Sequence, residues 1–512
     1  MNLQHFFDHW SIRENPFRGE EARQDAVFQK LGEEAGEGRL QTAAHSDFEK
    51  ILGQLDRPST SIVFGEKGSG KTAIRLQIAA AVAAHNKANP DGKALLIAYD
   101  ELNTVLDRFY ERAGGGEPLE VLRKLRLQDH IDGILMAAVP GMVDTIIGET
   151  ASGRSIDLGE GVRRRARSLD PTSRNDLVIL QSLYDRPERA DDRTAKLRKA
   201  IRVRRPLGAA GWTIGAYAGW LIPVGVIIAF FTIGNGETNV LWNTAFFLGL
   251  AAWVALLVKK FVFDAATMRR TARKLRRQIR VCKRLEQSFA ASIASIDPKH
   301  RHEGVLPLSD APDTRYALID RLRQVLAAFG YTAMIVVIDR IDEPSLVNGD
   351  AERMRAVVWP MLNNKFLQQD SLGVKMLLPI ELRHAIYKES SQFFQEARLD
   401  KQNMVDRLSW SGAMLFDLCE ARLRACRIEG AEPMSLLDMF AEDVTRQDLV
   451  DALEQMHQPR DAFKFIYACL NEHCQNVTAD QQQFRVPRLV LDAVRKRQAE
   501  RVQSLYRGIG PA

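Results

Sequence analysis

A glycine-rich segment near the start of the chain carries the residue types that bind phosphate. Ser61–Phe64 is a short apolar run typical of a strand, the next eight residues read GEKGSGKT, and an alanine-rich helix is expected from Thr72 to about Asn86. This order fits the pattern G-x-x-x-x-G-K-[ST], in which backbone N–H groups and a helix N-terminus surround phosphate oxygens. The expected nucleotide-binding residues are Gly65, Glu66, Lys67, Gly68, Ser69, Gly70, Lys71 and Thr72.

Two of these side chains have separate expected roles. Lys71 would reach the β- and γ-phosphates of a nucleotide, and the hydroxyl of Thr72 would ligate Mg²⁺. The strand, loop and helix occur in the required order, which makes a chance match to the pattern rare. The motif accepts either ATP or GTP, and ATP with Mg²⁺ is the expected pair.

An acidic cluster later in the chain is the expected partner of this loop. Ala333–Ile338 is an apolar run that leads into Asp339, Asp342 and Glu343. Asp339 would hold Mg²⁺ through water, and either Asp342 or Glu343 would polarise the attacking water. The alternative is a buried strand followed by a solvated, charged turn.

Two further apolar runs, Ala94–Tyr99 and Gly373–Pro379, bring the expected strands to four, with helices between them. This alternation predicts an α/β fold with an open parallel sheet and helices on both faces. Polar groups just beyond strand ends face the ligand in such sheets, so Arg383 is a candidate γ-phosphate sensor. Its alternative is a surface arginine at the start of a helix. After Arg398 the chain is expected to be helical, beginning with residues 404–410.

Two long uncharged segments in mid-chain have the length of membrane spans. Leu207–Ile233 has 27 residues without a charge and Val240–Val258 has 19, separated by a turn at 234–239. A bilayer core requires roughly 20 apolar residues per helix, so a two-helix transmembrane hairpin is predicted. The alternative is a buried helical hairpin in a soluble core.

The net charge of +6 conceals a strongly uneven distribution. Arg193–Arg205 holds seven bases and no acid, and Lys259–Arg284 holds eleven bases and one acid, so the remainder of the chain carries −11. Excess Lys and Arg beside a span stays cytoplasmic, which places both ends of the hairpin in the cytoplasm. The second basic segment favours contact with lipid headgroups over nucleic acid because it adjoins a span.

The second basic segment also predicts a long helix. No Gly or Pro occurs from Leu250 to Asp297, and apolar residues recur every three or four positions from Leu275 to Ile296. This stripe is expected to form one continuous helix that packs on helices around Leu177–Ile201 and acts as a stalk.

Other features narrow the possible functions. The composition is that of a globular protein, and the first 30 residues contain no secretory signal. Five scattered cysteines favour a reducing compartment over a disulfide framework. A zinc site at Cys469, His473 and Cys474 lacks a second ligand pair. A transporter is disfavoured because neither span contains a charged residue, and the acid cluster favours hydrolysis over a kinase reaction.

The segments GEKGSGKT and IVVIDRIDEP together resemble the additional-strand P-loop NTPases of the AAA+/STAND group. Lys71 and Asp339 are 268 residues apart, with the predicted hairpin between them, which resembles the KAP-type architecture. The resemblance covers about 46–110 and 331–470. KAP segments usually carry Arg after the second Asp, where this chain has Glu343, so the likeness to KAP concerns architecture only.

The resemblance implies several further properties. It implies ATP hydrolysis with Mg²⁺, a homo-oligomer, and a C-terminal lid in which Arg460 of the segment Gln458–Asp461 contacts a nucleotide phosphate. Related families include bacterial proteins implicated in defence against phage. The residues from Pro487 to Tyr506 are expected to form a winged-helix-like end.

The predicted organisation has seven parts. They are an N-terminal segment (1–45), the first NTPase part (46–150), a helical stalk (151–206), the transmembrane hairpin (207–258), a basic helical stalk (259–300), the second NTPase part (301–398) and a C-terminal helical lid or effector domain (399–512). The predicted function is a membrane-anchored, Mg²⁺-dependent ATPase that acts as a switch or assembly motor, with a membrane-tethered nucleic-acid-handling ATPase as the alternative. The expected location is the inner (plasma) membrane, as a two-span protein with both termini and the NTPase domain in the cytoplasm.

Overall fold

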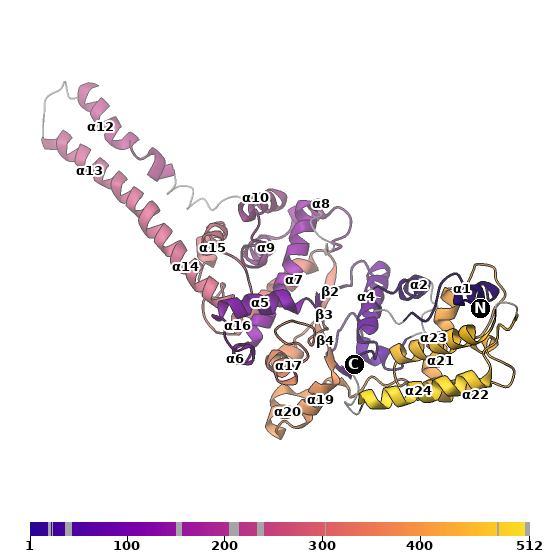
Figure 1. The fold of residues 1–512 in the computed structure, drawn as a ribbon. Coiled ribbons are helices and arrows are strands. Elements are labelled where there is room, and N and C mark those ends of the chain that lie inside the picture. Colours follow the sequence, from indigo (N-terminus) through magenta and orange to yellow (C-terminus); the bar gives the residue numbers. More distant parts are fainter. Residues whose placement is uncertain are drawn as a thin grey trace. The chain divides into compact units, whose positions relative to one another are not determined.

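The computed structural model forms two compact units (Figure 1). It describes residues 1–18, 22, 24–35, 44–149, 156–203, 214–232, 240–302, 304–478 and 481–506. Unit 1 comprises Met1–Asn89, Lys93–Asp100 and Ala333–Ala512, and unit 2 comprises Pro90–Gly92 and Glu101–Thr332. Residues 207–213 and 233 of the first predicted span, and the predicted turn at 234–239, lie outside the described residues.

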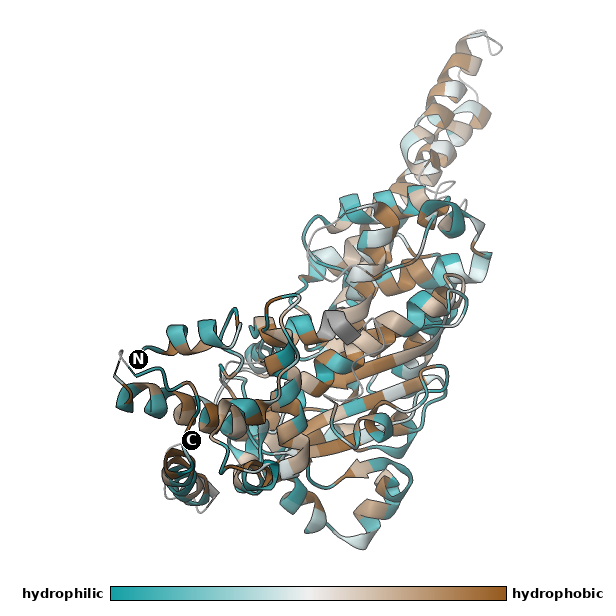
Figure 2. Cartoon of the chain, turned by 90° about the vertical axis from the view of Figure 1, so that its right-hand side faces the viewer, coloured by the Kyte–Doolittle hydropathy of each residue, from teal (hydrophilic) through white to brown (hydrophobic). Residues whose placement is uncertain are grey.

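Unit 1 is built on a five-stranded parallel sheet, which confirms the predicted α/β class. The strand order is β2-β3-β4-β1-β5. The strands are β1 (Ser61–Gly65), β2 (Lys93–Tyr99), β3 (Tyr331–Ile338), β4 (Leu372–Pro379) and β5 (Asn403–Val405). Every residue of β1 and β4 is buried, as expected for parallel strands covered on both faces, and the central strands are largely apolar in Figure 2.

One prediction for the sheet was wrong. Residues 404–410 were expected to be helical, but Asn403–Val405 forms β5, and an irregular segment follows it to Ser411. β5 pairs in parallel with β1, with Ser61 opposite Asn403 and Val63 opposite Val405. Pairing with a strand more than 300 residues away overrides the local preference of so short an apolar segment.

Unit 1 also contains most of the shorter helices and the C-terminal helices. They are α1 (Leu3–His9), α2 (Ala26–Ala35), α3 (Phe48–Leu52), α4 (Lys71–Ala88), α17 (Ala351–Val358), α18 (Asn364–Leu367), α19 (Ile380–Tyr387), α20 (Ser391–Ala397), α21 (Gly412–Ala425), α22 (Arg446–Glu454), α23 (Pro459–Asn476) and α24 (Arg488–Tyr506). Residues 488–506 form this single helix, so the expected winged-helix-like end is not observed in the described residues.

The N-terminal segment shares a hydrophobic core with the C-terminal helices. Phe6, Phe7 and Phe17 are buried in the same cluster as Leu415 of α21 and Phe465 of α23. The backbone N–H of Arg13 also donates to the Cys426 carbonyl at 2.8 Å. Residues at the two ends of the sequence therefore stabilise one helical body beside the sheet.

A buried lysine in the centre of the sheet makes the stability of unit 1 depend on pH. Lys375 in β4 is fully buried, and its Nζ donates to the Ser59 carbonyl at 2.7 Å and to Ser61 Oγ at 3.3 Å. Burial lowers the pKa of Lys375 to about 7, whereas an unfolded lysine titrates near 10.4. Between these values the unfolded chain binds the extra proton, so the free energy of unfolding should rise with pH.

We expect Lys375→Met to flatten this pH dependence. Between pH 7 and pH 9.5, the free energy of unfolding of the wild type should rise with pH more steeply than that of the variant, by about 1 kcal/mol per pH unit. The upper limit for one proton is about 1.4 kcal/mol per pH unit. Denaturant unfolding followed by tryptophan fluorescence measures both slopes, and Lys388→Met, at an exposed lysine, is the control. Equal slopes in the wild type and Lys375→Met would contradict the assignment.

Unit 2 is helical. Its described helices are α5 (Leu102–Arg112), α6 (Pro118–Leu122), α7 (Leu127–Ile147), α8 (Val162–Ser168), α9 (Pro171–Tyr184), α10 (Ala190–Ile201), α12 (Leu221–Thr232), α13 (Val240–Val258), α14 (Ala265–Gln278), α15 (Glu286–Ile293) and α16 (Asp313–Ala327). The long apolar helix α7 is mostly buried, and it packs against α9, α10 and α16.

The predicted stalk helix is partly confirmed. The helix that starts at Val240 continues through a π-helical segment, Lys259–Asp264, and ends at Gln278. The helix is then interrupted until α15 begins at Glu286, so the prediction of one continuous helix to Ile296 was wrong. α15 does pack on α9 and α10, as predicted.

Hydrogen bonds between segments far apart in the chain explain the break. Arg112 donates to the carbonyls of Arg276 and Cys282, at 2.8 and 2.9 Å, which partly replaces the helical bonds lost there. Arg284 turns inward, is 1% exposed and donates to the Ser182 carbonyl at 2.5 Å. These long-range contacts stabilise a bend that apolar spacing alone does not reveal.

Among the described residues, three helices are long and apolar enough to cross a membrane by composition. They are Leu127–Ile147 (α7), Ile214–Thr232, which includes α12, and Val240–Gln278. In the apolar 18-residue stretch of each helix, the buried share is 78%, 17% and 0%, respectively. Figure 2 shows apolar residues along both hairpin helices. The two helices pack closely through glycine, because a Cβ at Gly219 would lie 2.7 Å from Trp253 Cδ1.

Candidate functional site

The predicted phosphate loop connects β1 to α4, with the strand–loop–helix order expected from the sequence. Gly68 and Gly70 have φ values of +100° and +95°, which glycine adopts without strain. A Cβ on Gly68 would lie 2.8 Å from Gln458 Oε1. Backbone conformation and close approach therefore both explain glycine at position 68.

The Lys71 side chain lies against the loop that precedes it. Its Nζ donates to the Gly65 carbonyl at 2.7 Å and to the Glu66 carbonyl at 2.9 Å. Burial lowers the pKa of Lys71, and the nearby carboxylates of Asp342 and Asp339 oppose this shift. The ammonium is thus held at the start of α4 among acidic groups.

Asp339 follows β3 directly and lies beside the start of α4. Thr72 Oγ1 donates to Asp339 Oδ2 at 3.4 Å, which joins two motifs 267 residues apart in the chain. The carboxyl is 1% exposed, and burial raises the pKa of Asp339 to about 6. β1 and β3 both pair in parallel with β4, so the groups that follow them lie at the same, carboxyl edge of the sheet.

Arg75 ties Asp339 to the end of β2. Its Nη1 donates to Asp100 Oδ2 at 2.8 Å, and its Nε lies 3.4 Å from Asp339 Oδ2. Asp100 follows β2, so the carboxyl ends of β2 and β3 are linked through one side chain of α4. The Arg75 guanidinium therefore lies between the Asp100 and Asp339 carboxylates and offsets their charge.

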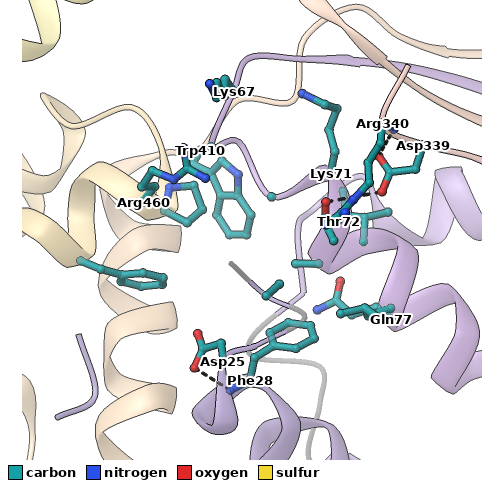
Figure 3. Close-up of a pocket in the computed structure, with 18 of the residues that line it drawn as sticks. Asp25, Phe28, Lys67, Lys71, Thr72, Gln77, Asp339, Arg340, Trp410 and Arg460 are labelled. Atoms are coloured by element: carbon teal, nitrogen blue, oxygen red, sulfur yellow. Dashed lines mark hydrogen bonds between the residues drawn. The ribbon is translucent and has the colours of Figure 1, made fainter. Parts of the chain in front are cut away.

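A cavity of about 700 Å³ opens at this edge of the sheet (Figure 3). One end is lined by loop residues and acids, and the other by side chains of α2, α4, α21 and α23. The predicted site residues among its lining are Lys67, Gly68, Gly70, Lys71, Thr72, Asp339, Asp342, Glu343 and Arg460. This volume is within the range of small-molecule sites.

The two candidate catalytic acids differ in their surroundings. Glu343 is half exposed, and its Oε2 accepts from Arg340 Nη1 at 3.3 Å. Asp342 is less exposed, and it is the carboxylate that most favours the charged form of Lys71. Both line the cavity, so geometry leaves both as candidates for orienting water.

Residues after β5 and at the start of α23 contact the loop. Arg407 Nη2 lies 2.7 Å from Glu66 Oε1, and Gln458 Nε2 donates to Glu66 Oε2 at 2.5 Å. Trp410 Nε1 donates to the Ser69 carbonyl at 2.9 Å, and its indole borders the cavity in Figure 3. Arg460 also lies beside the loop, since a Cβ placed on Gly68 would be 3.3 Å from the Cβ of Arg460.

The other predicted site residues lie around the cavity or outside it. Gly65, Glu66 and Ser69 belong to the loop but do not line the cavity. Arg383 is also absent from the lining; its guanidinium lies 5.1 Å from the centre of the Tyr387 ring in α19. The cavity therefore brings together most of the predicted residues, but not Arg383.

The donor set at the carboxyl edge fits Mg²⁺. Thr72 offers a hydroxyl and Asp339 a carboxylate, and Mg²⁺ binds through one or two such oxygens together with waters and substrate phosphates. Among the described residues there is no group of three or more His, Cys, Asp or Glu side chains that would hold a metal unaided. A cation there would depend on a phosphate ligand.

Sequence reasoning missed several residues of the site. Asp100 directly follows an expected strand, so its position at a strand end was a usable signal. Trp410, Arg422 and Asp25 carried no such signal, because each reaches the site through contacts between segments far apart in the chain.

A scan against protein-family models and searches of curated proteins and of solved structures found no match to this chain.

Proposed function

We propose that the chain is a membrane-anchored, Mg²⁺-dependent P-loop ATPase that acts as a nucleotide-driven switch or assembly motor. The observation that carries this proposal is the juxtaposition of Thr72 and Asp339, 3.4 Å apart beside Lys71 at the edge of a parallel sheet. A cavity of about 700 Å³ adjoins them. Strand β4, between β1 and β3, has the place of the extra strand from which the additional-strand group takes its name.

The chemistry proposed is attack of water on the γ-phosphate in line with the leaving ADP. Lys71 neutralises charge that develops on the transferred phosphoryl group, and the loop N–H groups bind the phosphate chain. Bound Mg²⁺ would supply further neutralisation of the phosphate oxygens, held by Thr72 and by Asp339 through water. Glu343 orients the attacking water, with Asp342 as the other candidate, and Arg460 reaches the phosphates from α23.

The anchoring part of the proposal rests on exposed apolar surface. The buried share of the apolar 18-residue stretch in Val240–Gln278 is 0%, and Phe247 and Leu248 are 65% and 66% exposed. Lys260 Nζ lies 3.7 Å from the centre of the Tyr217 ring, which pairs a cation with an aromatic ring where the apolar helices end. Both spans are proposed to cross the inner membrane, with the sheet in the cytoplasm.

The test is ATP turnover by purified, detergent-extracted protein, with and without Mg²⁺. The proposal predicts phosphate release that requires both Mg²⁺ and an intact loop. Absence of turnover together with absence of nucleotide binding would overturn it.

Glu343→Gln is expected to lower ATP turnover at least tenfold while leaving ATP affinity within about twofold. The amide keeps the size of the side chain but accepts a proton poorly, so it orients water less well. Single-turnover phosphate release and equilibrium ATP binding measure the two effects. Asp342→Asn, assayed in parallel, is the comparison: a larger loss of turnover in Asp342→Asn would transfer the role to Asp342.

A further inference from the structure

The helix that follows the second predicted span has a strongly basic face. Figure 1 shows α13 and α14 as parts of one continuous helix. Ala272 and Leu275 of α14 are buried, and this side of the helix packs on α15. Six exposed bases lie on the other side, within about 160° of the helix circumference at 3.6 residues per turn. They are Arg269, Arg270, Arg273, Lys274, Arg276 and Arg277.

The bases of this face have little acidic compensation. Arg273 Nη2 lies 3.5 Å from Glu286 Oε1, and the other five make no ion pair among the described residues. Further along the chain the bases turn inward, since Arg280 pairs with Asp129 and Arg284 is 1% exposed. Like charges three or four residues apart on a helix destabilise it. The face of α14 therefore retains a repulsion that an external anion would relieve.

An apolar segment between the span and the basic face sets the distance of that face from the bilayer. Phe261 and Phe263 lie between α13 and α14 and are 54% and 65% exposed, so entering the hydrocarbon core stabilises them. From Val240 to Phe263 the helix rises about 35 Å, which a tilted helix fits into a core about 30 Å thick. Arg269 and Arg270 then lie about 10 Å further along the helix, beside the headgroup layer.

We infer that the basic face of α14 binds the phosphate groups of anionic phospholipids in the cytoplasmic leaflet. Guanidinium groups donate paired hydrogen bonds to phosphate oxygens, and the long stems of arginine and lysine let their charged ends reach a nearby headgroup layer. The field of an anionic leaflet extends over roughly 8 Å at physiological salt, which covers the first turns of α14. The inference rests on the proposed membrane anchoring and adds to it the class of lipid that the chain binds.

Nucleic acid is the competing anion, and the place of α14 in the chain favours lipid. The helix joins the basic face directly to a span, so headgroups stand beside this face at a high effective concentration. A duplex would have to approach Arg269 and Arg270 against repulsion from the same anionic leaflet. Continuity with the span and complementary charge therefore both select the lipid headgroup.

The first experiment compares two lipids on the detergent-extracted wild-type chain. Brominated phosphatidylglycerol and brominated phosphatidylcholine are added separately to the detergent micelles, and quenching of tryptophan fluorescence reports binding. Trp220 and Trp253 lie in the cytoplasmic halves of the two proposed spans, near the acyl chains of a lipid bound at α14. We expect phosphatidylglycerol to bind at least about tenfold more tightly, because each base near an anionic surface contributes about fivefold. Equal affinities would overturn the inference.

The second experiment removes charge from the end of the face nearest the span. Arg269→Gln, Arg270→Gln and Lys274→Gln are combined in one variant, and glutamine retains helix propensity. The affinity for phosphatidylglycerol should fall at least about tenfold, while the affinity for phosphatidylcholine stays within about twofold of the wild-type value. An unchanged preference for phosphatidylglycerol in this variant would overturn the inference.

A matched control changes an exposed basic helix of the same unit that adjoins no span in the sequence. Arg164→Gln, Arg165→Gln and Arg167→Gln in α8 remove the same number of charges. This variant should keep the wild-type preference for phosphatidylglycerol. An equal loss of preference in the α8 variant would show that net charge, and not the face of α14, selects the lipid, which would overturn the inference.

Two further measurements separate the competing anion and the anchor from the lipid. Fluorescein-labelled duplex DNA should bind no more tightly to the wild type than to the α14 variant. DNA binding that only the α14 variant loses, together with equal affinities for the two lipids, would overturn the inference and assign the face to nucleic acid. Release of the wild type from membranes by alkaline carbonate would overturn the proposed anchoring and the inference with it. Equal lipid affinities in a chain that resists the wash would overturn the inference alone.

Discussion

Lys71→Ala is expected to lower the rate of ATP hydrolysis by at least about a hundredfold. Removing one preorganised donor from charge that develops in a transition state typically costs 10²- to 10³-fold in rate. Lys71 is half-buried, and its Nζ donates to the carbonyls of Gly65 and Glu66, so phosphate oxygens are the natural alternative acceptors. Measuring kcat and KM for phosphate release in both proteins checks this expectation.

The control for this substitution lies on the same helix. Lys87→Ala removes an exposed lysine near the C-terminal end of α4 and should leave turnover unchanged. Alanine is the best helix former, so neither change should disturb α4. Equal turnover in the wild type and Lys71→Ala would remove Lys71 from the catalytic role, and it would leave the nucleotide site without its main cation.

The sheet and the strand–loop–helix unit at 61–88 were predictable because their signals are local. Ser61–Phe64, the glycines after it and the helix from Lys71 each follow from a short pattern, and Asp339 follows from its position after an apolar run. Strand β5 was not predictable, because its three residues form a strand only by pairing with β1. Nor was the bend after Gln278, which depends on Arg112 and Arg284 contacts with distant carbonyls.

The same distinction applies to the site. Lys71, Thr72 and Asp339 were predicted from the residues that flank them. The far end of the cavity is formed by Asp25 and Arg422, which are 397 residues apart in the chain and joined by an ion pair. No spacing pattern encodes such a pair, because tertiary packing of the N-terminal segment on α21 creates it. Arg383 shows the converse, since its position after β4 predicted a role at the site, yet it stacks on Tyr387.

The sheet constrains how many of the three apolar helices can cross a membrane. β2 and β3 are neighbours in one sheet, and all three helices lie in the chain between them. The chain must therefore return to the side from which it left, so the number of spans between the strands is even. Because 78% of the apolar 18-residue stretch of α7 is already buried by protein, α12 and α13 are the pair proposed to enter the bilayer.

We expect Leu221→Arg combined with Leu248→Arg to abolish stable membrane insertion. Both leucines are more than half exposed, at 53% and 66%, and lie near the middle of the two predicted spans. An arginine at the centre of a span costs about 2.5–3.5 kcal/mol on insertion scales, so the two together outweigh a typical margin. The measurement is the fraction of the protein that stays in the membrane pellet after alkaline carbonate washing.

A matched variant separates the effect of insertion from that of added charge. Leu489→Arg with Ile428→Arg adds two arginines at exposed apolar positions of unit 1, where the side chains are 81% and 45% exposed. This variant should stay in the pellet like the wild type, because neither site enters the bilayer. Release of the wild type by the wash would refute the hairpin as a membrane anchor. Retention of the hairpin variant would instead require another anchor. In the part of the chain that the structure describes, α7 is then the remaining helix that is both long and apolar enough, although its buried side chains would first have to leave the core of unit 2.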